Sequence, residues 1–163
     1  MIRAVHKKAL AGAGLAGAIS LAAMSIYQDE GERHRVYRDV VGVPTYCVGE
    51  TRNPDWSRVY SHEDCMALLN GRLYEFAAAV QRCIHVPMSD ARLASLINFS
   101  YNLGGGILCH AVGNKIICST LATRLNANDP AACDAMLMYD RAGGRRIAGL
   151  HARRERNRAM CQQ

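Results

Sequence analysis

The chain has 163 residues, about one domain's worth, and half of them are hydrophobic, which excludes a largely disordered protein. Its formal net charge is +6, and residues 141–158 contain seven arginines but one acid. Such a surface either attracts polyanions or is simply a solvated helix face, and the scarcity of aromatic side chains argues against nucleic-acid stacking.

The N-terminal segment 9–27, ALAGAGLAGAISLAAMSIY, carries no charge. As a helix it would reach about 28 Å, close to the hydrocarbon thickness of a bilayer. Arg3, Lys7 and Lys8 precede it and acids follow, so the N-terminus is expected to stay cytoplasmic while the rest is exported. Because 12 of the 19 residues are Ala, Gly or Ser, the segment is only marginally apolar.

Three fates are open to this segment. It could be a signal peptide cleaved after Ala23, a permanent anchor packed through its small residues, or an anchor that inserts and later leaves the bilayer. Cleavage after Ala23 would leave too few residues before Glu30 for a stable helix. If Glu30 is functional, this favours retention, with an anchor over residues 1–27 and one further domain over residues 28–163.

The remaining pattern predicts a hairpin over residues 36–48 followed by helices. Ser61 and Asp64 are spaced as a capping box, and an apolar stripe follows them to Cys83. Further helix starts are predicted at three polar positions, which are Ser89, Ser119 and the pair Asp129-Pro130. A final basic helix is expected over residues 151–161. The fold class is therefore α+β, with a small sheet and a helical lobe.

Seven cysteines are scattered along the chain, at positions 47, 65, 83, 109, 118, 133 and 161. No C-x-x-C pair or histidine spacing typical of zinc is present, so no metal site is expected. Scattered cysteines favour disulfides in an oxidising compartment, and the odd number leaves at least one unpaired. Composition does not choose the pairing, and seven reduced core cysteines remain the alternative.

Glu30, Asp39 and Thr45 are the candidate catalytic residues. A glycosidase needs one protonated carboxyl group and a second group that handles water on the other side of the sugar. Glu30 falls at the exit of the first helix, Asp39 at a hairpin, and Thr45 on the returning strand, where its hydroxyl could hold a water. Taken alone, this spacing is more typical of a charged surface.

The surrounding letters, EGERHRVYRDVVGVPTYCVGET, resemble the catalytic segment of the phage-type lysozymes, glycoside hydrolase family 24. That family's pattern is E-G, an aromatic residue before R/K-D, a glycine, and T-x-x-x-G. The matching positions here are Glu30, Gly31, Tyr37, Asp39, Gly42, Thr45 and Gly49. SHEDCMALLN, FSYNLGGG and RAGGRRIAGLHARR resemble the family's inter-lobe helix, groove motif and C-terminal element, so the resemblance covers about residues 28–161.

The resemblance implies a lysozyme-like fold, in which a long helix joins a small β lobe to a helical lobe. It implies cleavage of the β-1,4 bond between N-acetylmuramic acid and N-acetylglucosamine, with inversion and without a cofactor. Glu30 would be the general acid, while Asp39 and Thr45 would place the water and steady the cationic transition state. Asn102 is carried over as a binding candidate, and Arg145 and Arg153 would meet anionic wall groups or form structural salt bridges.

Two departures from the family pattern concern the cleft. The histidine common after T-x-x-x-G is Glu50 here, and residues 109–118, CHAVGNKIIC, look like an insertion. The resemblance also folds the last two helices together, so Cys133 and Cys161 are expected to pair. Cys47 and Cys65 are the next pair, and Cys83 is then expected to pair with Cys109 or Cys118, leaving one cysteine free.

The weak anchor ahead of Glu30 resembles the signal-anchor-release endolysins, whose tethered form is inactive and whose released segment refolds into the catalytic domain. This implies an inactive form tethered to the inner membrane of an infected bacterium, then an active soluble periplasmic monomer. A holin or pinholin would act upstream without direct contact. The alternative function is an exported, disulfide-stapled basic module that binds cell wall or membrane without cutting it. A DNA-binding domain conflicts with the export signal.

Overall fold

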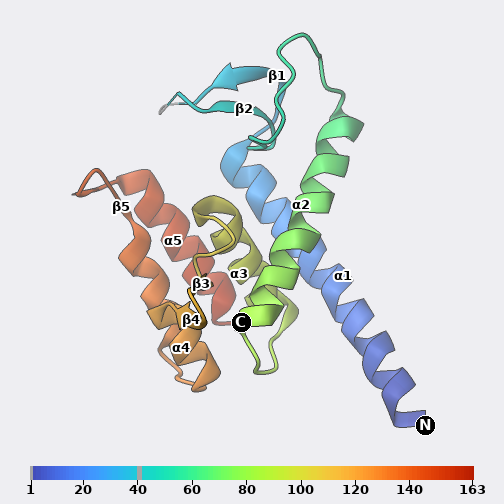
Figure 1. The fold of residues 1–163 in the computed structure, drawn as a ribbon, viewed down its shortest axis with the longest axis vertical. Coiled ribbons are helices and arrows are strands. Elements are labelled where there is room, and N and C mark those ends of the chain that lie inside the picture. Colours follow the sequence, from blue (N-terminus) through green and yellow to red (C-terminus); the bar gives the residue numbers. More distant parts are fainter. Residues whose placement is uncertain (1, 40–41) are drawn as a thin grey trace.

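The computed structural model describes residues 2–39 and 42–163, and for residues 2–14 it describes the backbone alone. The helices are α1 (Ile2–Glu30), α2 (His62–Cys83), α3 (Asp90–Leu103), α4 (Thr120–Asn126), the 3₁₀ helix η1 (Ala132–Tyr139) and α5 (Ala148–Cys161). The strands pair as antiparallel hairpins, β1 (Arg33–Arg38) with β2 (Pro44–Cys47), β3 (Cys109–Val112) with β4 (Lys115–Cys118), and β5 (Arg141–Ala142) with β6 (Arg145–Arg146). Hairpin β1–β2 lies at one end of the molecule and most of the helices at the other, which confirms the α+β class (Figure 1).

Helix α1 packs on α3 through small side chains. Ala18 and Ala22 are fully buried, and a Cβ added to Gly17 would lie 2.3 Å from an oxygen of Asp90. The helix ends at Glu30 because Gly31 adopts a left-handed φ of +68°. In the part of the chain whose side chains are described, no helix is long and apolar enough to cross a membrane. Residues 9–14, the first part of the predicted anchor, lie outside those described side chains.

Helix α2 connects the β1–β2 end to the helical lobe, as predicted (Figure 1). Its start is the predicted capping box, in which the Ser61 hydroxyl accepts from the Asp64 N–H at 3.1 Å and the Asp64 carboxylate accepts from the Ser61 N–H at 3.0 Å. Its predicted apolar stripe is buried, at Cys65, Leu69, Leu73, Phe76, Val80 and Cys83.

The second half of the chain contains the predicted helices, but two of them start elsewhere, and one also changes helix type. Helix α5 begins at Ala148, three residues before the predicted start at residue 151. Ser89 and Ser119 cap α3 and α4 as expected. After Asp129, however, the chain forms a 3₁₀ helix that begins at Ala132, since Ala132 and Asp134 bond to carbonyls three residues earlier. The predicted insertion at residues 109–118 is the exposed hairpin β3–β4.

Three disulfides staple the described chain, two of them as predicted. Cys47–Cys65 joins β2 to α2, and Cys133–Cys161 joins η1 to α5. The expected pairing of Cys83 with Cys109 or Cys118 is wrong. Those two cysteines face each other across hairpin β3–β4 and bond to each other, which leaves Cys83 free and buried on α2. Burial raises the pKa of the Cys83 thiol.

Candidate active site

A cleft of about 650 Å³ lies where the end of α1, hairpin β1–β2, α2 and the end of α3 meet. Glu30, Asp39 and Thr45, predicted from sequence spacing, all line it, and so does Asn102. Arg145 does not line this cleft, because it lies on the exposed hairpin β5–β6. The structure thus gathers four of the six predicted residues at the cleft, and neither Arg145 nor Arg153 lines it.

The Glu30 carboxylate is held from the C-terminal helix. Arg153 of α5 donates from Nη1 to Glu30 Oε1 at 2.6 Å, and the arginine itself is only 7% exposed. Among the described residues, Glu30 Oε2 has no hydrogen-bond partner, and it faces Gly49, where an added Cβ would come within 3.4 Å. The φ of Gly49, +76°, also favours glycine. Arg153 therefore takes the structural salt-bridge role, the second of the two roles expected for it.

Behind Glu30, a buried polar cluster fixes the position of Arg153. Its Nε lies 3.1 Å from Asp29 Oδ2, and its Nη2 donates to Asn98 Oδ1 at 3.2 Å. Asn98 in turn donates to Ser25 on α1 at 2.8 Å, and Arg156 donates to Asp29 at 2.6 Å. Charged groups that are buried and paired in this way are costly to disrupt, so α1, α3 and α5 share one rigid support for Glu30.

On the hairpin side, the cleft is lined by Asp39 and Thr45, which bond to the backbone of Val43. The Val43 N–H donates to Asp39 Oδ1 at 2.8 Å, and the Thr45 hydroxyl donates to the Val43 carbonyl at 3.0 Å. Thr45 pairs with Tyr37 across β1–β2 and is 5% exposed. One residue, Val43, therefore orients both candidate side chains through its backbone.

The hydrogen bond from Arg154 determines the orientation of the Asn102 amide. The fully buried Arg154 donates from Nη2 to Asn102 Oδ1. Because a guanidinium can only donate, the oxygen of the amide faces Arg154 and its NH₂ group faces away. Burial lowers the pKa of Arg154 to about 10, so this arginine remains charged at neutral pH.

Sequence reasoning missed the residues that α2 adds to the cleft, and also Tyr101 on α3. Arg72 and Glu75 line it from α2, joined by a 2.6 Å ion pair, and Tyr101 lines it from α3 and donates to the Val48 carbonyl. Burial raises the pKa of Tyr101, which keeps its phenol a neutral donor. The spacing of Arg72, Glu75 and Phe76 along one helix face was the available signal.

Glu50, the departure from the family histidine, is buried at 4% exposure. Its Oε1 accepts from the N–H groups of Thr51 and Arg52 at 2.9 and 2.8 Å, and its Oε2 lies 3.4 Å from Arg72 Nε. An ion pair with Arg72 thus ties the end of the hairpin region to α2 at the position of that histidine.

Comparisons with known proteins agree with this architecture. The phage lysozyme family model matches residues 27–157. The SAR-endolysin of Escherichia phage Mu is 36% identical over 147 residues, a match that covers 90% of this chain and 81% of the relative. The SAR-endolysin of bacteriophage PS119 is 35% identical over 134 residues, and this match covers 81% of this chain and 75% of the relative. The crystal structure of the active form of P1 phage endolysin Lyz shares the fold, with a TM-score of 0.75 at 16% identity. The match covers 86% of this chain and 82% of the Lyz chain. The chain therefore belongs to the phage lysozyme family.

Proposed function

We propose that this chain is an exported muramidase. It hydrolyses the β-1,4 bond between N-acetylmuramic acid and N-acetylglucosamine in bacterial peptidoglycan, for host lysis and phage release. The observation that carries the proposal is the convergence of Glu30, Asp39 and Thr45 on one cleft. Membership of the phage lysozyme family supports the same activity, and a basic module that binds the wall without cutting it is not favoured.

Glu30 is the proposed general acid. Its Oε1 is fixed by Arg153, so the carboxyl group has one defined orientation. Its Oε2, which lacks a hydrogen-bond partner among the described residues, is the atom that gives its proton to the glycosidic oxygen. Gly49 supports this role, because a larger residue there would crowd Oε2.

Asp39 and Thr45 are proposed to hold the attacking water. The Thr45 hydroxyl donates its hydrogen bond to the Val43 carbonyl, so its oxygen can only accept a hydrogen bond from a water. The Asp39 carboxylate is an acceptor as well. These two acceptors receive hydrogen bonds from both O–H groups of one water. The lone pair of this water then points at the anomeric carbon, on the face away from Glu30. This arrangement gives inversion.

Asn102 is the proposed substrate-binding residue. Arg154 fixes its oxygen, so its NH₂ group is available to a carbonyl or hydroxyl oxygen of the glycan. Arg153 supports catalysis by holding Glu30 and does not meet the wall directly. Arg145, exposed on β6, is left as a contact for anionic wall groups outside the cleft.

Residues 1–27 are proposed to tether the exported chain to the inner membrane and then to leave it. The names of the relatives, SAR-endolysins, support this proposal. In the folded protein α1 continues through residues 27 and 28 without a break, and Ala18, Ala22 and Ile26 belong to the core. A chain whose α1 is in the bilayer cannot make these contacts, so it is inactive until release. The released protein is a periplasmic monomer, and a holin or pinholin acts upstream without contacting it.

Activity is tested by incubating the purified full-length chain with peptidoglycan and measuring new reducing ends. Steady release of reducing ends is expected. Tight binding to the wall without any release would overturn the muramidase proposal in favour of a binding module.

Release is tested by replacing Gly12 and Gly14 with leucine while keeping Gly17, whose replacement would collide with Asp90 in the folded protein. The two leucines add about 1–2 kcal/mol of membrane preference or more. We expect export, retention in the membrane fraction and little lysis, whereas the wild type accumulates as full-length soluble protein. Gly12→Ser with Gly14→Ser is the matched control and should be released. Soluble wild-type protein that begins at Met24 would instead show a cleaved signal peptide.

A further inference from the structure

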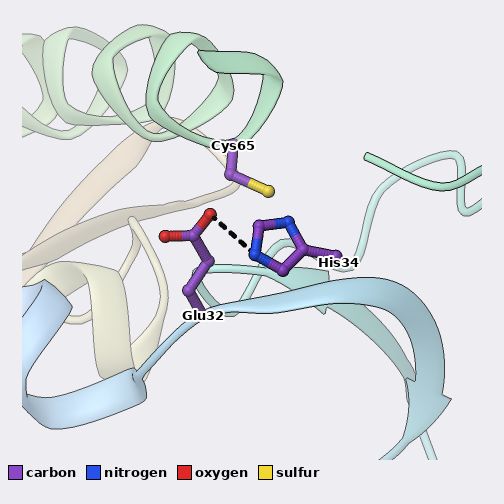
Figure 2. Close-up of side chains that lie close together, drawn as sticks. All are labelled: Glu32, His34 and Cys65. Atoms are coloured by element: carbon purple, nitrogen blue, oxygen red, sulfur yellow. Dashed lines mark ion pairs between the residues drawn. The ribbon is translucent and has the colours of Figure 1, made fainter. Parts of the chain in front are cut away.

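Two residues past Glu30, a cluster of metal-ligating side chains lies outside the cleft. Figure 2 shows Glu32, His34 and Cys65 converging between the start of β1 and the first turn of α2. Each residue has a ligand atom within 4.8 Å of the ligand atoms of the other two. Cys47 brings a second sulfur, since it is bonded to Cys65. A carboxylate, an imidazole and a sulfur therefore lie close together, and a second sulfur is bonded to the first.

The hydrogen bond of His34 prepares its ring for a metal. His34 Nδ1 lies 2.8 Å from the carbonyl oxygen of Tyr60. Because a carbonyl only accepts, Nδ1 is the nitrogen that carries a proton, and Nε2 is the nitrogen whose lone pair a metal can take. That nitrogen faces Glu32 Oε1 at 3.6 Å (Figure 2). A metal-binding histidine is usually fixed by such a backbone contact on its other nitrogen.

The carboxylate is fixed in the same way. Glu32, whose side chain is 7% exposed, accepts from the Tyr27 hydroxyl at 2.9 Å and lies 2.9 Å from His62 Nδ1. A tetrahedral zinc ion holds its ligand atoms roughly 3.5 Å apart. For Glu32, His34 and Cys65, shifts of about 1 Å would bring the ligand atoms to this spacing, and Cys47 would join them once its bond to Cys65 is broken.

The disulfide decides whether this site exists. A sulfur bonded to another sulfur is no thiolate, so the oxidised protein offers only Glu32 and His34. We propose that reduction of Cys47–Cys65 creates a Zn²⁺ site formed by Cys47, Cys65, His34 and Glu32. Two low-molecular-weight thiols reduce the disulfide to two cysteine thiols and become a disulfide themselves, and zinc binding then releases the two thiol protons. Thiolate and imidazole ligands favour zinc over magnesium or calcium.

The proposal gives one junction two alternative cross-links. In an oxidising compartment the disulfide ties β2 to α2, and in a reducing one the metal ties the same two elements and adds β1. Only the metal form would also hold His34, at the start of β1 and four residues past Glu30, against α2. This inference does not depend on the proposed hydrolase activity.

The test uses the full chain with Cys83, Cys109 and Cys118 replaced by serine, which keeps the other two disulfides. After reduction with a phosphine, Co²⁺ serves as the spectroscopic probe and Zn²⁺ as the competitor. We expect one equivalent of Co²⁺ with the absorption of four-coordinate thiolate cobalt, displaced by Zn²⁺. The oxidised protein should bind at least about a hundredfold more weakly, because it lacks both thiolates.

Matched variants locate the site. On that background, Cys47→Ser with Cys65→Ser should abolish the thiolate absorption, whereas Cys133→Ser with Cys161→Ser should keep it. His34→Ala should weaken binding about tenfold or more, while His110→Ala, exposed on β3, should not. Absorption that survives loss of Cys47 and Cys65, or equal affinity in oxidised and reduced protein, would overturn the proposal.

Folding of the reduced chain is followed separately by circular dichroism. If reduction loosens the fold, Zn²⁺ should restore helical signal and raise the melting temperature of the background chain, but not of its His34→Ala variant. An identical response in the two proteins would contradict a site that includes His34.

Discussion

The two sides of the cleft are built in different ways. Glu30 is oriented by Arg153, a residue 123 positions away, and by the buried cluster behind it. Asp39 and Thr45 are oriented by Val43, which is at most four positions from either. The proposed acid therefore depends on the packing of α1 against α3 and α5, whereas the proposed water-holding side depends on hairpin β1–β2. We propose that α1 lies first in a membrane. Release of α1 would then bring Glu30 to Arg153, whereas the contacts of Asp39 and Thr45 with Val43 do not involve α1.

The largest expected effect is that of Glu30→Gln. Glutamine keeps the size of the side chain and the hydrogen bond from Arg153 but has no proton to transfer. Turnover on peptidoglycan should fall at least about a hundredfold, with an unchanged circular dichroism spectrum. Glu155→Gln, the same change on the exposed face of α5, is the control and should leave activity unchanged. Near-normal lysis by Glu30→Gln would refute its assignment as the acid.

Arg153→Met should damage both stability and activity. It leaves Asp29 and Glu30 without their shared cation, and breaking a buried ion pair costs about 3–5 kcal/mol. Arg145→Met, on exposed β6, should change the free energy of unfolding by less than about 0.5 kcal/mol. Urea unfolding of both variants checks this, and equal stability of the two would show that the cluster does not support the acid side.

Asp39→Asn and Thr45→Ala should separate activity from stability. Each lowers turnover by about tenfold or more, because an acceptor for the water is lost. Each changes the free energy of unfolding by less than about 1 kcal/mol, since the hairpin keeps its backbone hydrogen bonds. If either variant unfolds as readily as Arg153→Met, hairpin β1–β2 is not the independent unit described above.

Sequence reasoning succeeded where the determining contact is local. The Ser61 and Asp64 capping box, the α2 stripe and the placement of the Glu30–Gly31 pair at a helix end follow from residues within one or two turns. The three cleft residues came from the resemblance of one continuous segment, which spans the whole of hairpin β1–β2.

It failed where distant parts of the chain decide. The sequence does not distinguish Arg153 from a surface arginine, because its ion-pair partner Glu30 lies near the other end of the chain. Cys83 was assigned a partner by elimination, but the register of β3–β4 places Cys109 opposite Cys118. The segment after Asp129 has a sound helix start, yet its hydrogen bonds follow the tighter 3₁₀ pattern.

The measurement that tests the two-sided account most directly is the configuration of the product. An acid on one face and a held water on the other invert the anomeric carbon, so a β-1,4 bond yields an α reducing end. Proton NMR in the first minutes of hydrolysis, before mutarotation, should show the α anomer of the new N-acetylmuramic acid end. An initial β anomer would mean retention, and would contradict a water delivered by Asp39 and Thr45 from the side opposite Glu30.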